Sequence, residues 1–121
     1  MRRTEPTESQ IEKGLFEWLA YHKNIGDFAF KITNEAGSRS AYEMKSLVNR
    51  GLREGFPDIG IMIPNDDLKL HGCFIELKTK TGRVSNAQKI WLERLTSQGY
   101  LAKVCYGLDS AIETINMYIQ S

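Results

Sequence analysis

The sequence has few residues of the kinds that form disulfides, zinc sites or membrane spans. It contains two cysteines, Cys73 and Cys105, and two histidines. Both cysteines fall in apolar runs of strand character, where a thiol usually behaves as a small buried group, so we expect neither a disulfide nor a zinc centre. No apolar run approaches the roughly 18 residues of a membrane span, and no leader with a basic and then an apolar region is recognisable. These absences favour a cytoplasmic protein with no membrane partner.

Internal repeats, low-complexity tracts and linkers are also missing. The 121 residues are 41% hydrophobic and 26% charged, so we expect a single domain over residues 1–121. The net charge of +1 gives no indication of a polyanionic partner. Residues 69–103, however, carry more basic than acidic side chains. That half of the chain could face phosphates, although a solvated helix face with strand ends would explain the same excess.

Two apolar runs separated by a polar segment predict a β-hairpin in the middle of the chain. The runs are residues 59–63 and 73–77. Strand side chains alternate between the two faces of a sheet, so the apolar residues of both runs would share one face. In a symmetric register, Asp58 stands opposite Glu76 on the other face, with Cβ atoms roughly 4.5 to 5.5 Å apart, and Lys78 follows two residues along. Two carboxylates and an ammonium then converge.

This convergence needs a physical explanation, because like charges on neighbouring strands oppose folding unless a cation lies between them. Mg²⁺ prefers oxygen ligands and is usually held by one or two carboxylates with waters and substrate phosphate, and Asp58 and Glu76 supply such ligands. Lys78 can position or deprotonate a water and neutralise charge on a phosphate. An exposed sheet face would explain Glu76 and Lys78 alone. The segment Gly-Phe-Pro-Asp that ends at Asp58 favours the metal site.

The segment Gly55-Phe56-Pro57-Asp58, followed eighteen residues later by Glu76-Leu77-Lys78, resembles the signature of the PD-(D/E)XK nucleases. With Gln88 ten residues after the lysine, this form is similar to the virus-type replication-repair nuclease (VRR-NUC) family. The similarity runs over most of the chain, from the first helix to the last. It implies the restriction-endonuclease-like αβββαβ core, an α/β fold with a mixed central sheet flanked by helices. The expected order of helix, strand, hairpin, helix, strand and helix agrees with that core.

The resemblance also implies an activity, the hydrolysis of DNA phosphodiester bonds by an endonuclease that depends on Mg²⁺ or Mn²⁺. Asp58, Glu76 and the carbonyl of Leu77 would hold the metal, and Lys78 would position or activate the attacking water. Small, stand-alone family members look like structure-selective nucleases of branched DNA such as Holliday junctions, often as homodimers. A homodimer is also favoured by size, since a chain this short has little surface with which to grip a duplex alone.

The first helix is expected to supply a further carboxylate. A capping box that begins at Thr7 and an apolar stripe at helical spacing predict a helix over residues 8–23. Glu8 falls inside this stripe, but the helix dipole alone explains an acid in the first turn. Glu12 falls at the edge of the stripe. The resemblance implies that a first-helix glutamate reaches the metal site, often through water, and Glu12 matches that position better, so we expect Glu12, with Glu8 as the alternative.

Gln88 has two interpretations. It completes a second capping box, Ser85-Asn86-Ala87-Gln88, in which its side chain would fold back on the backbone of Ser85. The resemblance implies instead that it projects over the metal centre and helps to hold substrate or water. The two roles are compatible only in part, and we expect the functional one.

A polar segment over residues 38–54, with a helical turn expected at residues 42–48, is too long for a simple connection. It leads straight into the site, so we interpret it as a flap that contacts the DNA backbone. A surface loop that contains a short helix and has no contact with DNA would give the same sequence pattern. The side chains expected to contact DNA, from this segment and from the region after the hairpin, are Arg39, Lys45, Arg53, Lys80 and Lys89.

Two other interpretations of the chain stay open. One is a non-catalytic nucleic-acid-binding module that retains the nuclease fold, against which the intact Asp58, Glu76 and Lys78 argue. The other is a nuclease with different duties, such as a restriction or transposition partner, for which the sequence offers no specificity domain.

Overall fold

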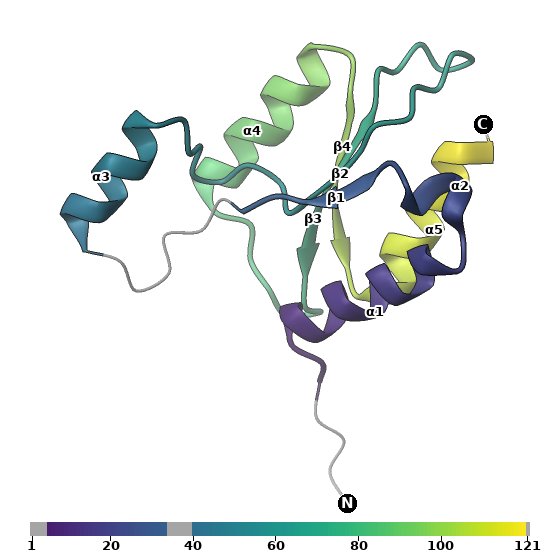
Figure 1. The fold of residues 1–121 in the computed structure, drawn as a ribbon, viewed down its shortest axis with the longest axis horizontal. Coiled ribbons are helices and arrows are strands. Elements are labelled where there is room, and N and C mark those ends of the chain that lie inside the picture. The colour runs from purple at the N-terminus through teal and green to yellow at the C-terminus, as the bar shows by residue number, and fades with distance from the viewer. Residues whose placement is uncertain (1–4, 34–39, 121) are drawn as a thin grey trace, which may run out of the picture.

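The computed structural model describes residues 5–33 and 40–120. In this part of the chain a four-stranded mixed sheet lies at the centre, in the order β1-β2-β3-β4 (Figure 1). Successive strands pair antiparallel except for β3 and β4, which are parallel. The strands are β1 (Ala29–Lys31), β2 (Ile59–Ile61), β3 (Cys73–Lys78) and β4 (Leu101–Tyr106), and the helices are α1 (Glu8–Ala20), α2 (Lys23–Gly26), α3 (Ala41–Asn49), α4 (Asn86–Ser97) and α5 (Leu108–Gln120). The expected α/β fold with a mixed central sheet flanked by helices is confirmed.

Helices cover both faces of the sheet. On one face, α1 and α5 enclose the main core, in which Leu15 and Ile115 meet Ile59 and Ile75 with all four side chains fully buried. On the other face, α4 packs through an aromatic cluster. There the ring of Phe56 lies 5.0 Å from that of Trp91 on α4. The helix α3 stands away from the sheet, and none of its residues is buried (Figure 1).

The hairpin has the register expected from the alternation of apolar side chains. Ile59 pairs with Ile75 and Ile61 pairs with Cys73, so these four side chains lie on the core face. Continued by one residue, the same register places Asp58 opposite Glu76. Asp58 and Glu76 therefore lie in one row across the sheet, with Lys78 two residues further along β3, next to a buried core that fixes their backbone.

Two elements differ from expectation. The first helix ends at Ala20 instead of near residue 23, because His22 has φ −123° and ψ 67°, which are not helical values. Its ring stacks on Trp18 and its Nδ1 lies 2.9 Å from the carbonyl oxygen of Trp18, which satisfies a carbonyl at the helix end. The strand expected between the first helix and the hairpin is short and contains only Ala29–Lys31.

Gly55 allows the Gly-Phe-Pro-Asp segment to lie directly against α4. Its φ is +85°, and a Cβ built there would lie 2.5 Å from the carbonyl carbon of Ala87. We predict that Gly55→Ala destabilises the protein by about 2 to 4 kcal/mol, because backbone strain and displacement from α4 add. Gly51→Ala is the matched control, since Gly51 has φ +107° but nothing within 4 Å of the added atom, so it carries the strain alone. Urea denaturation measures both, and equal losses would contradict the packing role of Gly55.

Candidate metal centre

Three carboxylates from three separate elements meet at one point. Asp58 directly precedes β2, Glu76 lies within β3, and Glu8 lies in the first turn of α1. One oxygen of each lies within 4.8 Å of the others. Oxygen ligands of one Mg²⁺ or similar hard cation are separated by no more than about 4 to 5 Å, so these three carboxylates fit a single ion.

Glu76 is the member of this cluster whose surroundings fit a cation site best. Its side chain is 2% exposed, and its Oε1 is buried with no hydrogen-bond partner among the described residues. Burial raises the pKa of Glu76 to about 9. A hydrogen bond with Asp58 and repulsion from the charges of Asp58 and Glu8 add to the rise, and the charge of Lys78 opposes it. A buried carboxylate oxygen without a partner is costly in free energy, and a divalent cation would satisfy it.

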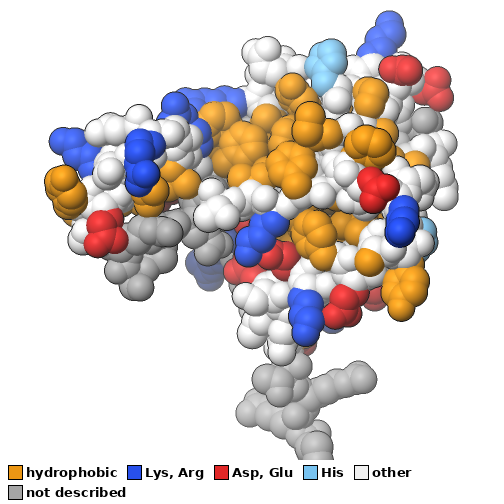
Figure 2. Space-filling view, in the orientation of Figure 1, with side chains coloured by type: hydrophobic (Ala, Val, Ile, Leu, Met, Phe, Trp, Pro, Cys, Tyr) orange, Lys and Arg blue, Asp and Glu red, His pale blue; other side chains and the backbone are white. Residues whose placement is uncertain are grey.

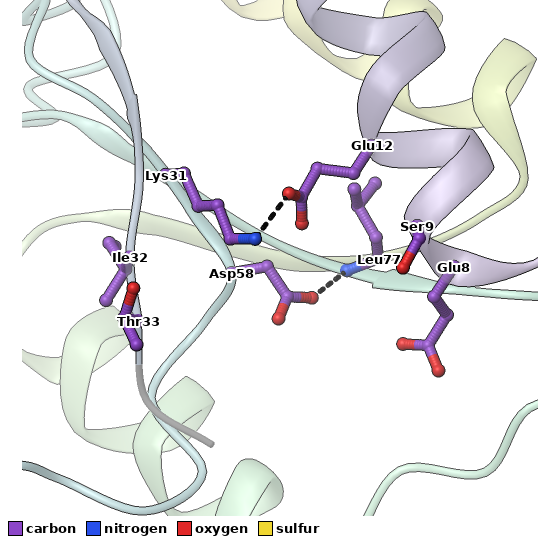
Figure 3. A pocket seen from close by; sticks show the side chains of 8 residues that line it. All are labelled: Glu8, Ser9, Glu12, Lys31, Ile32, Thr33, Asp58 and Leu77. Carbon is purple, nitrogen blue, oxygen red and sulfur yellow. Dashed lines mark hydrogen bonds and ion pairs between the residues drawn. The ribbon is translucent and has the colours of Figure 1, made fainter. Parts of the chain in front are cut away.

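Asp58 is held in place by the neighbouring strand. The backbone N–H of Leu77 donates a hydrogen bond of 2.8 Å to Oδ2 of Asp58, which leaves the other carboxylate oxygen directed into the pocket (Figure 3). The bond fixes the side chain before any ligand arrives. Leu77 also lines the pocket, and the role expected for its carbonyl as a metal ligand stays a prediction.

The structure places Glu8, not Glu12, within the carboxylate cluster. The two lie one helical turn apart, about 6 Å along α1, so they cannot both occupy the same point. Glu12 forms an ion pair with Lys31, whose Nζ lies 2.8 Å from Oε1 of Glu12 (Figure 3). Both side chains line the same pocket of about 140 Å³ as Glu8 and Asp58. The expected action of Glu12 on the metal through water stays a prediction.

Lys78 is buried beside the cluster, with 8% of its surface exposed. It follows Glu76 by two residues on β3, so both side chains lie on the same face of the sheet. The backbone at Gly82 lies against its aliphatic stem, since a Cβ there would be 3.2 Å from Cβ and Cδ of Lys78. The ammonium lowers the pKa of Glu76, which places its charge within electrostatic reach of the cluster.

Gln88 forms the capping box that the sequence indicated. The Ser85 N–H donates to Oε1 of Gln88 over 2.8 Å, and the Gln88 N–H donates to Oγ of Ser85 over 3.2 Å. Because Oε1 is occupied by the cap, a contact with substrate would have to use the Nε2 amide. The functional role of Gln88 stays a prediction.

The basic residues expected to contact DNA lie on different parts of the surface. Lys45 is exposed on α3, and Lys80 and Lys89 are exposed beyond β3 and on α4. Arg53 donates from Nη1 to the carbonyl oxygens of Val48 and Leu52, so it is partly engaged with the end of the α3 segment. Arg39 lies outside the described residues.

Sequence reasoning ranked Glu8 below Glu12 and did not single out Lys31. The signal for Glu8 was present, since it falls inside the apolar stripe of α1 that faces the sheet. Lys31 carried no such signal, because its approach to Glu12 depends on how α1 packs beside β1.

The fold and the site define the class of protein, a restriction-endonuclease-like α/β domain with a PD-(D/E)XK arrangement of acidic and basic residues. A family model described as the VRR-NUC domain matches residues 7–109, and the chain belongs to this family. A solved structure titled "VRR_NUC domain protein" is similar, with 26% sequence identity and a TM-score of 0.85 over 98% of this chain and 92% of that one. A comparison with curated protein sequences gives no significant match. Within the described ranges, no helix has the length and apolar character needed to cross a membrane.

Proposed function

We propose that this chain is a metal-dependent endonuclease that hydrolyses phosphodiester bonds in DNA, with branched DNA such as Holliday junctions as its preferred substrate. The observation that carries the proposal is that Oε1 of Glu76, within a cluster of three carboxylates, is buried and has no hydrogen-bond partner in the part of the chain that the structure describes. Membership of the VRR-NUC family and a nuclease-type fold give this cluster its interpretation. The ion would be Mg²⁺ or Mn²⁺, since the donors are all oxygen atoms.

The residues of this chain take distinct roles in that reaction. Asp58, Glu76 and Glu8 would hold the cation, which when bound supplies positive charge to stabilise the scissile phosphate in the transition state. The Leu77 N–H keeps Asp58 oriented, so little reorganisation is needed on binding. Lys78, buried beside Glu76, would position or activate the attacking water and stabilise negative charge on the phosphate.

DNA would be held by basic side chains outside the cluster. Of those proposed, Lys45, Lys80 and Lys89 are exposed and carry unit charges suited to phosphates. Arg53 and Arg39 are proposed for the same role from their place in the segment that leads to Asp58. Gln88 would contribute a polar contact near the metal.

A homodimer is proposed as the working form. Large apolar side chains are exposed next to β1 and β2 and on α3, among them Phe28 at 54%, Met62 at 68% and Tyr42 at 83%. Figure 2 shows apolar side chains gathered near the middle of the face turned to the viewer. Exposed apolar surface of this kind is typical of interaction sites, and a second copy would also enlarge the surface that meets DNA.

The proposed function is tested by incubating the protein with flap, fork, four-way-junction and plain duplex DNA, each with Mg²⁺, with Mn²⁺ and with EDTA. We expect metal-dependent cutting that is faster on a branched substrate than on the duplex. Binding of all substrates without cutting in either metal would instead indicate a non-catalytic nucleic-acid-binding module. Light scattering on the same sample measures whether the chain is a dimer.

A further inference from the structure

Lys31 stands at the mouth of the acidic pocket. It is the last residue of β1, an edge strand of the sheet, and its side chain is 58% exposed. Its Nζ lies 2.8 Å from Oε1 of Glu12, so the ammonium is held across the pocket from β1 toward α1 (Figure 3). Among the described residues that line this pocket, Lys31 is the single basic one.

The charges in the pocket leave a need for such a residue. The three clustered carboxylates, Glu12 and one divalent cation sum to a net charge of −2 when all four acids are ionised, and a phosphodiester entering the site brings another negative charge. Lys78 supplies positive charge from within the protein, but it is 8% exposed and lies beside Glu76. Lys31 supplies it at the entrance, where a phosphate of the DNA backbone would first meet the pocket.

We propose that Lys31 binds a non-bridging phosphate oxygen of DNA at the mouth of the metal site, and that Glu12 is the positioning residue that holds the Lys31 ammonium there. The inference rests on the proposed nuclease function and gives Glu12 a role different from metal binding. Lys31 acts as a point charge, so it contributes to affinity for the backbone and carries no sequence preference.

A purely structural explanation makes different predictions. A lysine on an edge strand discourages pairing with other strands, and an exposed ion pair contributes little to stability. If Lys31 served only that purpose, its removal would leave DNA affinity unchanged. Lys103 offers the matched control, because Lys31, Ile59, Ile75 and Lys103 form one row across the sheet and Lys103 is exposed at the opposite edge.

The experiment measures binding of a fluorescent four-way junction by anisotropy over a series of KCl concentrations, with Ca²⁺ in place of Mg²⁺ and intact DNA verified on a gel. We expect Lys31→Ala to raise Kd roughly tenfold at low salt and to reduce the slope of log K against log salt by about one. Lys31→Arg should retain the wild-type slope, and Lys103→Ala should match wild type. Equal effects of Lys31→Ala and Lys103→Ala would overturn the inference.

Glu12→Gln tests the positioning role, since it removes the charge that holds Lys31 but keeps the shape of the side chain. We expect a rise in Kd for DNA of about two- to threefold, with the affinity for Mn²⁺ in calorimetry unchanged. A tenfold loss of Mn²⁺ affinity would show that Glu12 acts on the metal and would overturn its assignment here. If wild-type protein binds no DNA, the proposed function and this inference are both refuted. If wild-type protein binds DNA and Lys31→Ala binds equally well, only this inference is refuted.

Discussion

Replacing Glu76 by glutamine is expected to abolish DNA cleavage and, in the absence of metal, to make the folded protein more stable at pH 7 to 9. Both effects come from the same side chain, which is 2% exposed and has an oxygen without a partner among the described residues. Glutamine keeps the shape of the side chain and is neutral without having to take up a proton on folding, but it lacks the carboxylate ligand that the cation would need. Activity and stability without metal should therefore change in opposite directions.

The sign of the pH dependence follows from the pKa of Glu76, raised by burial from 4.5 to about 9 in the folded protein. Between pH 4.5 and about 9, the carboxyl of Glu76 has lost its proton in the unfolded chain but still holds it in the folded protein. The folded state binds more protons, so the stability that Glu76 contributes is fully present below pH 4.5 and is lost as the pH rises through about 9. The glutamine variant has no such loss.

Urea denaturation in EDTA at pH 5, 7 and 9 measures this difference. The gap between Glu76→Gln and wild type should widen with pH, whereas Glu93→Gln, at an exposed position of α4, should follow wild type. Adding Mn²⁺ should raise the stability of the wild-type protein by an amount set by the occupancy of the metal site, and leave the stability of Glu76→Gln unchanged. A glutamine variant that is less stable than wild type at pH 9 without metal would contradict the role given to the buried charge.

Lys78→Ala is expected to lower the cleavage rate by roughly 10² to 10³ with only a small change in metal affinity. Lys78 lies beside Glu76, and its ammonium lowers the pKa of that carboxylate. Without the ammonium, the pKa of Glu76 rises further, so protons compete with the metal slightly better. That small loss of metal affinity should disappear as the pH is raised.

Lys78→Met separates charge from packing, because it keeps an unbranched stem against Gly82. Single-turnover cleavage and Mn²⁺ calorimetry on both variants measure the two quantities. If the stem alone were important, Lys78→Met would cut at the wild-type rate. If weakened metal binding were the main effect of either variant, the assignment of Lys78 to water and phosphate would be wrong.

The parts of the fold that the sequence predicted are those with local causes. The hairpin register follows from alternating apolar side chains, since a slip by one residue would move Ile59 and Ile75 to the wrong face. Both capping boxes, at Thr7 and Ser85, are formed within four consecutive residues. The row of Asp58 opposite Glu76 follows directly from that register.

The parts that the sequence did not predict depend on contacts between distant segments. The choice between Glu8 and Glu12 also depends on the position of α1 along the sheet, which the apolar stripe alone does not determine. The hydrogen bond between the hairpin connection and α5, in which Nδ2 of Asn65 donates to the Tyr118 carbonyl oxygen over 2.6 Å, was not predicted either. These contacts form only once the core has fixed the elements relative to one another.

A crystal soaked in Mn²⁺ and measured at a wavelength where manganese scatters anomalously tests the central claim most directly. We predict one anomalous peak within about 2.0 to 2.4 Å of carboxylate oxygens of Asp58, Glu76 and Glu8. A pocket without such a peak, or a peak held by Glu12 in place of Glu76, would contradict the account.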